Sequence, residues 1–132
     1  MTLGEFVKVL VAKLYEENVH IPYENEELWH ELFFELKNHQ DLDRKPPFFE
    51  TICFDWDGPY PKCKQLSDFL HALHWNSSVS AKNPHFDTIS PPQEIVTLWK
   101  TALDSMNQEE RSFFDESVTL ARKYFGDRKE AA

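Results

Sequence analysis

Hydrophobic side chains recur through the first 37 residues at the three- and four-residue spacing of two helices that each bury one face. Thr2 and Glu5 have the spacing of a capping box, so we expect a first helix that ends near Glu17. Asn25 has a side chain suited to cap the second helix. The expected inner faces are Phe6, Val7, Leu10, Val11 and Leu14, and then Leu28, Trp29, Leu32, Phe33 and Leu36.

The middle of the chain changes from helical periodicity to partial alternation. Residues 48–56 alternate in part and are rich in aromatic and β-branched side chains, which predicts a central strand. Gly58 and the neighbouring prolines end this strand, and a third helix is expected from about Lys62 to His74. Two short extended segments, 78–80 and 86–89, enclose turn residues and predict a hairpin.

Two more helices are expected in the last third of the chain. The dipeptide Pro91–Pro92 suits a helix entry, and apolar residues follow it at helical spacing. Asn107 and Glu110 repeat the capping-box spacing before a fifth helix, which Gly126 is expected to end.

These elements predict a fold that is mainly α with a small β element, an α+β domain. It has about five helices, one central strand and a short hairpin, and its middle is winged-helix-like. We expect residues 1–132 to form a single globular domain with a short flexible tail from about residue 127.

Composition narrows the classes of function. The net charge of −9 repels a phosphate backbone, so nucleic acid is disfavoured as a partner. No apolar run reaches the roughly 20 residues that cross a membrane, and the start of the chain lacks a signal-peptide pattern, which together predict a cytoplasmic protein without a membrane partner. With three glycines there is no phosphate-binding loop or dinucleotide fingerprint, so no cofactor is expected.

The two cysteines lack a CxxC unit. Cys53 and Cys63 are therefore expected to be reduced, with a disulfide between them as the alternative. A thiol in the first turn of the third helix has a lowered pKa, which makes Cys63 a nominal nucleophile. A small buried residue on the apolar stripe is the favoured interpretation of the same position.

Acidic and histidine residues around the turn form a candidate metal site. Asp55 and Asp57 flank Trp56, and His71 and His74 lie three residues apart on the third helix. Carboxylates and imidazoles together can hold a divalent cation, so a small metal-dependent hydrolase centred on these four residues is one hypothesis. No known ligand signature is present, and aspartates before a Gly-Pro pair commonly fix a turn, so the favoured prediction is no metal and no catalytic residue.

The same turn also predicts an interaction surface. Asp57, Tyr60, Lys62 and Lys64 surround it, and Lys82 lies in the expected hairpin. A winged-helix domain places its recognition helix and wing in these positions, which makes a DNA-binding regulator a further hypothesis. Three lysines without arginine form a thin basic patch, so contact with a protein is favoured.

Gly58-Pro59-Tyr60 form the turn, and behind them the expected third helix carries the apolar residues Leu66, Phe69, Leu70 and Leu73. This turn and helix resemble those of the SocA-like or Panacea-type antitoxins and related phage-associated small proteins. Asp57 before the glycine departs from the family pattern. The resemblance implies a protein-binding or regulatory role without catalytic residues. The leading prediction is therefore a small, non-enzymatic interaction or regulatory module.

Overall fold

The computed structural model describes residues 1–22, 26–38, 45–75 and 91–126, with the side chains of 73–75 excepted. These residues form six helices and no strand. The helices are α1 (Leu3–Glu16), α2 (Glu26–Asn38), α3 (Phe48–Thr51), α4 (Lys64–Trp75), α5 (Gln93–Asp104) and α6 (Gln108–Phe125). None of them is long and apolar enough to cross a membrane.

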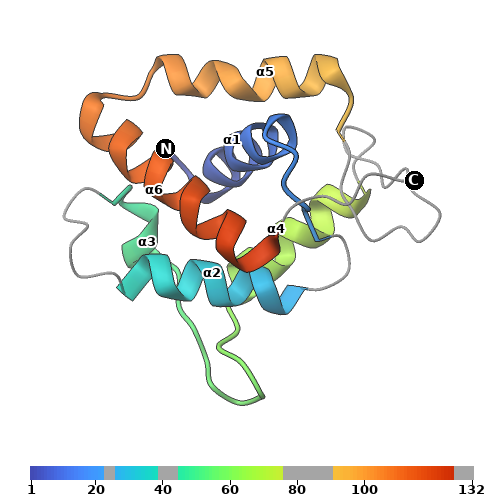
Figure 1. Ribbon diagram of the computed structural model, residues 1–132. Coiled ribbons are helices and arrows are strands. Elements are labelled where there is room, and N and C mark those ends of the chain that lie inside the picture. Colours follow the sequence, from blue (N-terminus) through green and yellow to red (C-terminus); the bar gives the residue numbers. More distant parts are fainter. Residues whose placement is uncertain (23–25, 39–44, 76–90, 127–132) are drawn as a thin grey trace.

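Helix α1 is the central element of the fold. It runs between α5 on one side and α6 on another, while α2 packs against the opposite part of α6 (Figure 1). Buried positions extend over most of α1, because Val9 and Ala12 are buried in addition to the predicted inner face, while Glu5 and Glu16 remain exposed. A helix with so wide an apolar surface has to be covered by several other elements, which accounts for its place at the centre.

Helix α4 approaches α1 where α1 begins. A Cβ atom on Gly4 would lie 2.9 Å from Cε2 of Phe69, so a larger residue there meets the aromatic ring. The glycine therefore permits the close approach of the two helices. Thr2 caps α1 through the bond that its hydroxyl accepts from the backbone N–H of Glu5, as the sequence predicts.

Helix α6 confirms the capping signals that the sequence predicts at both of its ends. Asn107 and Glu110 form the reciprocal capping box at the start of α6, and Gly126 follows its last residue with a φ of 79°. Ion pairs connect this end of the chain to α1. Nζ of Lys100 lies 2.9 Å from Oε1 of Glu16, and Nη2 of Arg122 lies 2.8 Å from Oε1 of Glu17.

Aromatic rings fill the centre of the core. The ring of Phe6 has five aromatic neighbours within 6.1 Å between centroids, from α2, α3 and α6. Trp29 closes the far end, since its indole N–H donates to the carbonyl of Pro22 and its ring lies 4.9 Å from that of Phe125. These contacts join four helices in one cluster. The rings around Phe6 are those of Phe33, Phe48, Phe49, Phe113 and Phe114.

The predicted central strand is wrong. Residues 48–51 form the single turn of α3, which begins after Pro47 and is followed by an extended connection from Ile52. A helical turn lets Phe48 and Phe49 face the core together, with ring centroids 4.4 Å apart, whereas a strand would direct them to opposite faces. Local aromatic and β-branched content favoured a strand, but burial of two consecutive rings decides for the helix.

The fold class changes accordingly. The described residues are all-helical, so the predictions of an α+β domain and of a winged-helix-like middle are wrong. The predicted hairpin at 78–80 and 86–89, and the tail from 127, lie outside the described residues. In place of the strand, Asp55 and Lys62 form an isolated antiparallel bridge.

Candidate functional site

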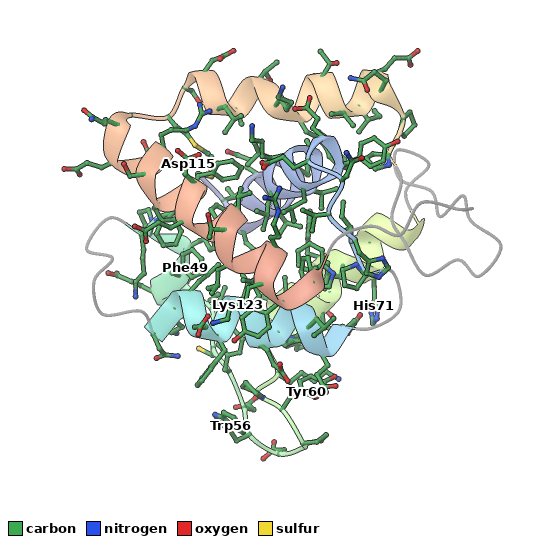
Figure 2. The ribbon with its side chains drawn as sticks, viewed as in Figure 1. Phe49, Trp56, Tyr60, His71, Asp115 and Lys123 are labelled. Atoms are coloured by element: carbon green, nitrogen blue, oxygen red, sulfur yellow. The ribbon has the colours of Figure 1, made fainter. Side chains whose placement is uncertain are left out.

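A loop between α3 and α4 extends away from the helical body on the side of α2, and Figure 2 shows Trp56 and Tyr60 on it. We call residues 54–62 the projecting loop. Asp55 and Lys62 exchange two backbone hydrogen bonds of 2.9 Å across it. The Lys37 ammonium of α2 donates to the carbonyl of Ile52, just before the loop. The loop is thus held at its base and closed by a bridge.

One side of the projecting loop is aromatic. Phe54 and Trp56 each place their ring 5.4 Å from that of Phe34 on α2, in nearly perpendicular arrangements. The side chain of Trp56 nevertheless remains 62% exposed. We call Phe34, Phe54 and Trp56 the aromatic face of the loop. It leaves a large aromatic side chain, that of Trp56, exposed to solvent.

The other side of the loop meets a buried histidine. The ring of Tyr60 lies 5.7 Å from that of His30 on α2. His30 is fully buried, and its Nδ1 accepts a 3.0 Å hydrogen bond from the backbone N–H of Cys63, at the end of the loop. An Nδ1 that accepts leaves the proton on Nε2, so the imidazole is neutral. Burial lowers the pKa of His30, against the opposing effect of Glu26.

Glu26 connects α2 with α4 beneath the loop. The hydroxyl of Ser67 donates to its Oε2 at 3.1 Å, and Nε2 of His71 lies 2.7 Å from its Oε1. Nε2 of His30 lies 3.7 Å from Oε2, outside hydrogen-bond reach. Because the serine donates its single proton to the carboxylate, this arrangement lacks the serine-to-imidazole bond that activates a nucleophile.

A pocket of about 490 Å³ lies between the projecting loop and α4. Its size falls in the range of small-molecule sites, roughly 300–1,000 Å³. Ser67 is its one buried lining residue, 7% exposed. The lining residues are Asp55, Asp57, Gly58, Pro59, Tyr60, Lys62, Lys64, Ser67 and Asp68.

Most residues of the predicted interaction surface line this pocket. Asp57, Tyr60, Lys62 and Lys64 all line it, whereas Lys82 lies outside the described residues. The partial alternation of the sequence is present locally, since Phe54 and Trp56 contact Phe34, while Asp55 between them and Asp57 after them line the pocket.

The four candidate metal ligands are distributed differently. Asp55 and Asp57 line the pocket, while His71 lies against Glu26. His74 is in α4, and its side chain lies outside the described part. Among the residues that the structure describes, no three His, Cys, Asp or Glu side chains are grouped as a metal site.

The cysteines are both reduced, and they differ in environment. Cys53 is exposed, whereas Cys63 is fully buried and its thiol donates to Oε1 of Gln65 at 3.3 Å. Cys63 precedes α4 instead of lying in its first turn, and burial raises its pKa, so the expected lowering is wrong. The hypothesis of a nucleophilic Cys63 loses its chemical basis.

The native protein is expected to react with a maleimide once, at Cys53, because thiolate formation and access both disfavour Cys63. Intact mass measurement during labelling at neutral pH checks this. The Cys53→Ser variant serves as the control and should gain its adduct only after denaturation. Equal labelling rates at the two positions would contradict the burial of Cys63.

Three residues of the site escaped the sequence prediction: Glu26, His30 and Ser67. A signal was present for the histidine, which follows Trp29 directly and precedes Leu32 on the buried face of α2. A polar residue within an apolar stripe needs a hydrogen-bond partner. That partner, the N–H of Cys63, is 33 positions away, so spacing alone does not indicate it.

No protein-family model matches the chain, and comparison with curated proteins and with solved structures finds no significant similarity.

Proposed function

We propose that this protein is a small, non-enzymatic interaction module that binds a protein partner through the aromatic face of the projecting loop. The observation that carries the proposal is the 62% exposure of Trp56 on a loop closed by a backbone bridge. Tryptophan is among the residues that most often dominate binding energy at protein interfaces.

The geometry of the loop supports this use. Pro59 and Pro61 restrict its backbone, and the Asp55–Lys62 bridge fixes its two limbs, so little conformational entropy is lost when a partner binds. Two carboxylates, Asp55 and Asp57, flank Trp56 in the sequence. We therefore expect the partner to present basic residues around an apolar pocket.

A regulatory, antitoxin-like role and a cytoplasmic location remain predictions from the sequence. The Gly58-Pro59-Tyr60 turn that carries the antitoxin resemblance belongs to the projecting loop and lines the pocket beside it, whereas the proposed docking through the aromatic face depends on Trp56.

The test compares the proteins that co-purify with the tagged wild type and with the Trp56→Ala variant from the native host. We expect at least one protein to be retained by the wild type and reduced roughly tenfold or more with the variant. Its retention should weaken as salt rises if its contact surface is basic.

Leu98→Ala is the matched control. Leu98 on α5 is 60% exposed, so the substitution removes a similarly exposed apolar side chain at a distance from the loop. Its partners should be those of the wild type. If no protein depends on Trp56, or if both variants lose the same proteins, the docking surface lies elsewhere.

A further inference from the structure

The pocket beside the projecting loop carries a pair of opposite charges on each of two walls. On the loop, Asp55 and Lys62 are hydrogen-bonded neighbours across the bridge, so their side chains leave the backbone on the same face. On α4, Lys64 and Asp68 are four residues apart and share a helix face. All four residues line the pocket.

These charges do not neutralise one another. Cross-strand and i,i+4 pairs of opposite charge commonly form ion pairs. Here neither these four residues nor Asp57 has an ion-pair partner within 4.0 Å among the described residues, although such pairs do occur on α1, α2 and α6. The pocket therefore offers ammonium groups and carboxylates that are available to a ligand.

The uncharged lining adds a second requirement. Ser67 is buried, and its hydroxyl proton is already donated to Glu26, so towards the pocket its oxygen can only accept. Tyr60, whose ring covers His30, and Pro59 supply apolar surface. A fitting ligand thus combines a hydrogen-bond donor, a group of each charge and some apolar area.

We propose that this pocket binds a small zwitterion, namely a free amino acid or a short unprotected peptide. Its ammonium group lies towards the aspartates and the Ser67 oxygen, and its carboxylate lies towards Lys62 and Lys64. A purely anionic ligand meets three carboxylates, and a purely cationic one meets two ammonium groups, so each is disfavoured by like charge.

The pocket and the proposed protein-docking surface use different parts of the projecting loop, although Asp55 and Asp57 flank Trp56 in the sequence and also line the pocket. The aromatic face joins Phe54 and Trp56 to Phe34 of α2, whereas the pocket opens between the loop and α4. The Trp56→Ala variant is therefore expected to bind the zwitterion as the wild type does, and failure of one proposal leaves the other standing.

The experiment follows backbone amide NMR signals of the full chain during titration with the common free amino acids and a panel of unprotected dipeptides. We expect saturable shifts at Tyr60, Lys62 and Lys64 with at least one of them. Each ligand that binds is then repeated in its N-acetylated and its C-amidated form. Both blocked forms should bind roughly tenfold more weakly, because each has lost one charge-assisted contact.

Variants separate recognition by the pocket from general charge effects. Lys64→Gln and Asp68→Asn should each weaken binding roughly tenfold. Lys123→Gln is the matched control, since Lys123 is exposed on α6 and does not line the pocket. Any of three results overturns the proposal: no shifts with any probe up to about 10 mM, equal binding of the blocked forms, or equal binding by the Lys64→Gln variant.

Discussion

Replacement of Phe6 by alanine is expected to lower the free energy of unfolding by about 3–5 kcal/mol. Phe6 is 1% exposed, and its ring touches those of five other phenylalanines that come from three helices. Truncation removes the apolar area of the ring and leaves a cavity that the surrounding helices can fill only in part.

Chemical denaturation of the two proteins measures this difference. Phe54→Ala is the control, because Phe54 is half-buried on the projecting loop and contacts a single ring, that of Phe34. The free energy of unfolding of this control variant should fall by about 1 kcal/mol. Similar losses in both variants would show that the centre of the core does not lie at Phe6.

The second large effect is expected at His30, where alanine should cost about 2–4 kcal/mol. The substitution leaves a cavity in α2 and removes the acceptor of the buried Cys63 N–H, which then has no partner. His30→Asn is the matched variant, since an amide oxygen can take the place of Nδ1. It should restore roughly half of the loss; no difference between the two variants would show that the hydrogen bond contributes little.

The same residue gives the protein a dependence on pH. Because burial lowers the pKa of His30 below 6.5, the unfolded chain binds a proton there before the folded chain does. Neutral His30 makes its full contribution to the free energy of unfolding above pH 6.5, and this contribution is lost as pH falls through that value towards the folded pKa. In this window the free energy of unfolding changes by at most about 1.4 kcal/mol per pH unit.

The groups that face His30 are Glu26, which opposes the shift, Lys62, which favours it, and the Tyr60 ring. Denaturation midpoints measured across this pH window should fall more steeply for the wild type than for His30→Asn, which retains every other titrating group. Parallel curves would mean that His30 does not titrate in this range.

The helices could be predicted because their signals are local. The N-cap at Thr2, the capping box at Asn107 and the glycine after α6 act within a turn of the residues they fix. The strand prediction failed because aromatic content is a weak guide to backbone conformation when two consecutive rings are both buried, as at Phe48 and Phe49.

The candidate site also has a part that local sequence signals predict and a part that they do not. Gly58 and the prolines indicated a turn, and the residues around it do line the pocket. The contacts beneath the loop join α2 to α4 over 41 residues in the case of Glu26 and Ser67, so no periodicity or motif predicts them. Only the packing of the two helices brings those side chains together.

The enclosed position of α1 has a consequence for how the chain reaches its fold. Its covering helices come late in the sequence, and the ion pairs that join it to α5 and α6 span 84 and 105 residues. Such long sequence separations raise the contact order above that of helices packed only on their neighbours in sequence, which slows folding. During synthesis the part of α1 that α5 and α6 cover stays exposed until both helices have emerged from the ribosome, and in that interval a nascent chain is exposed to aggregation and to chaperone binding.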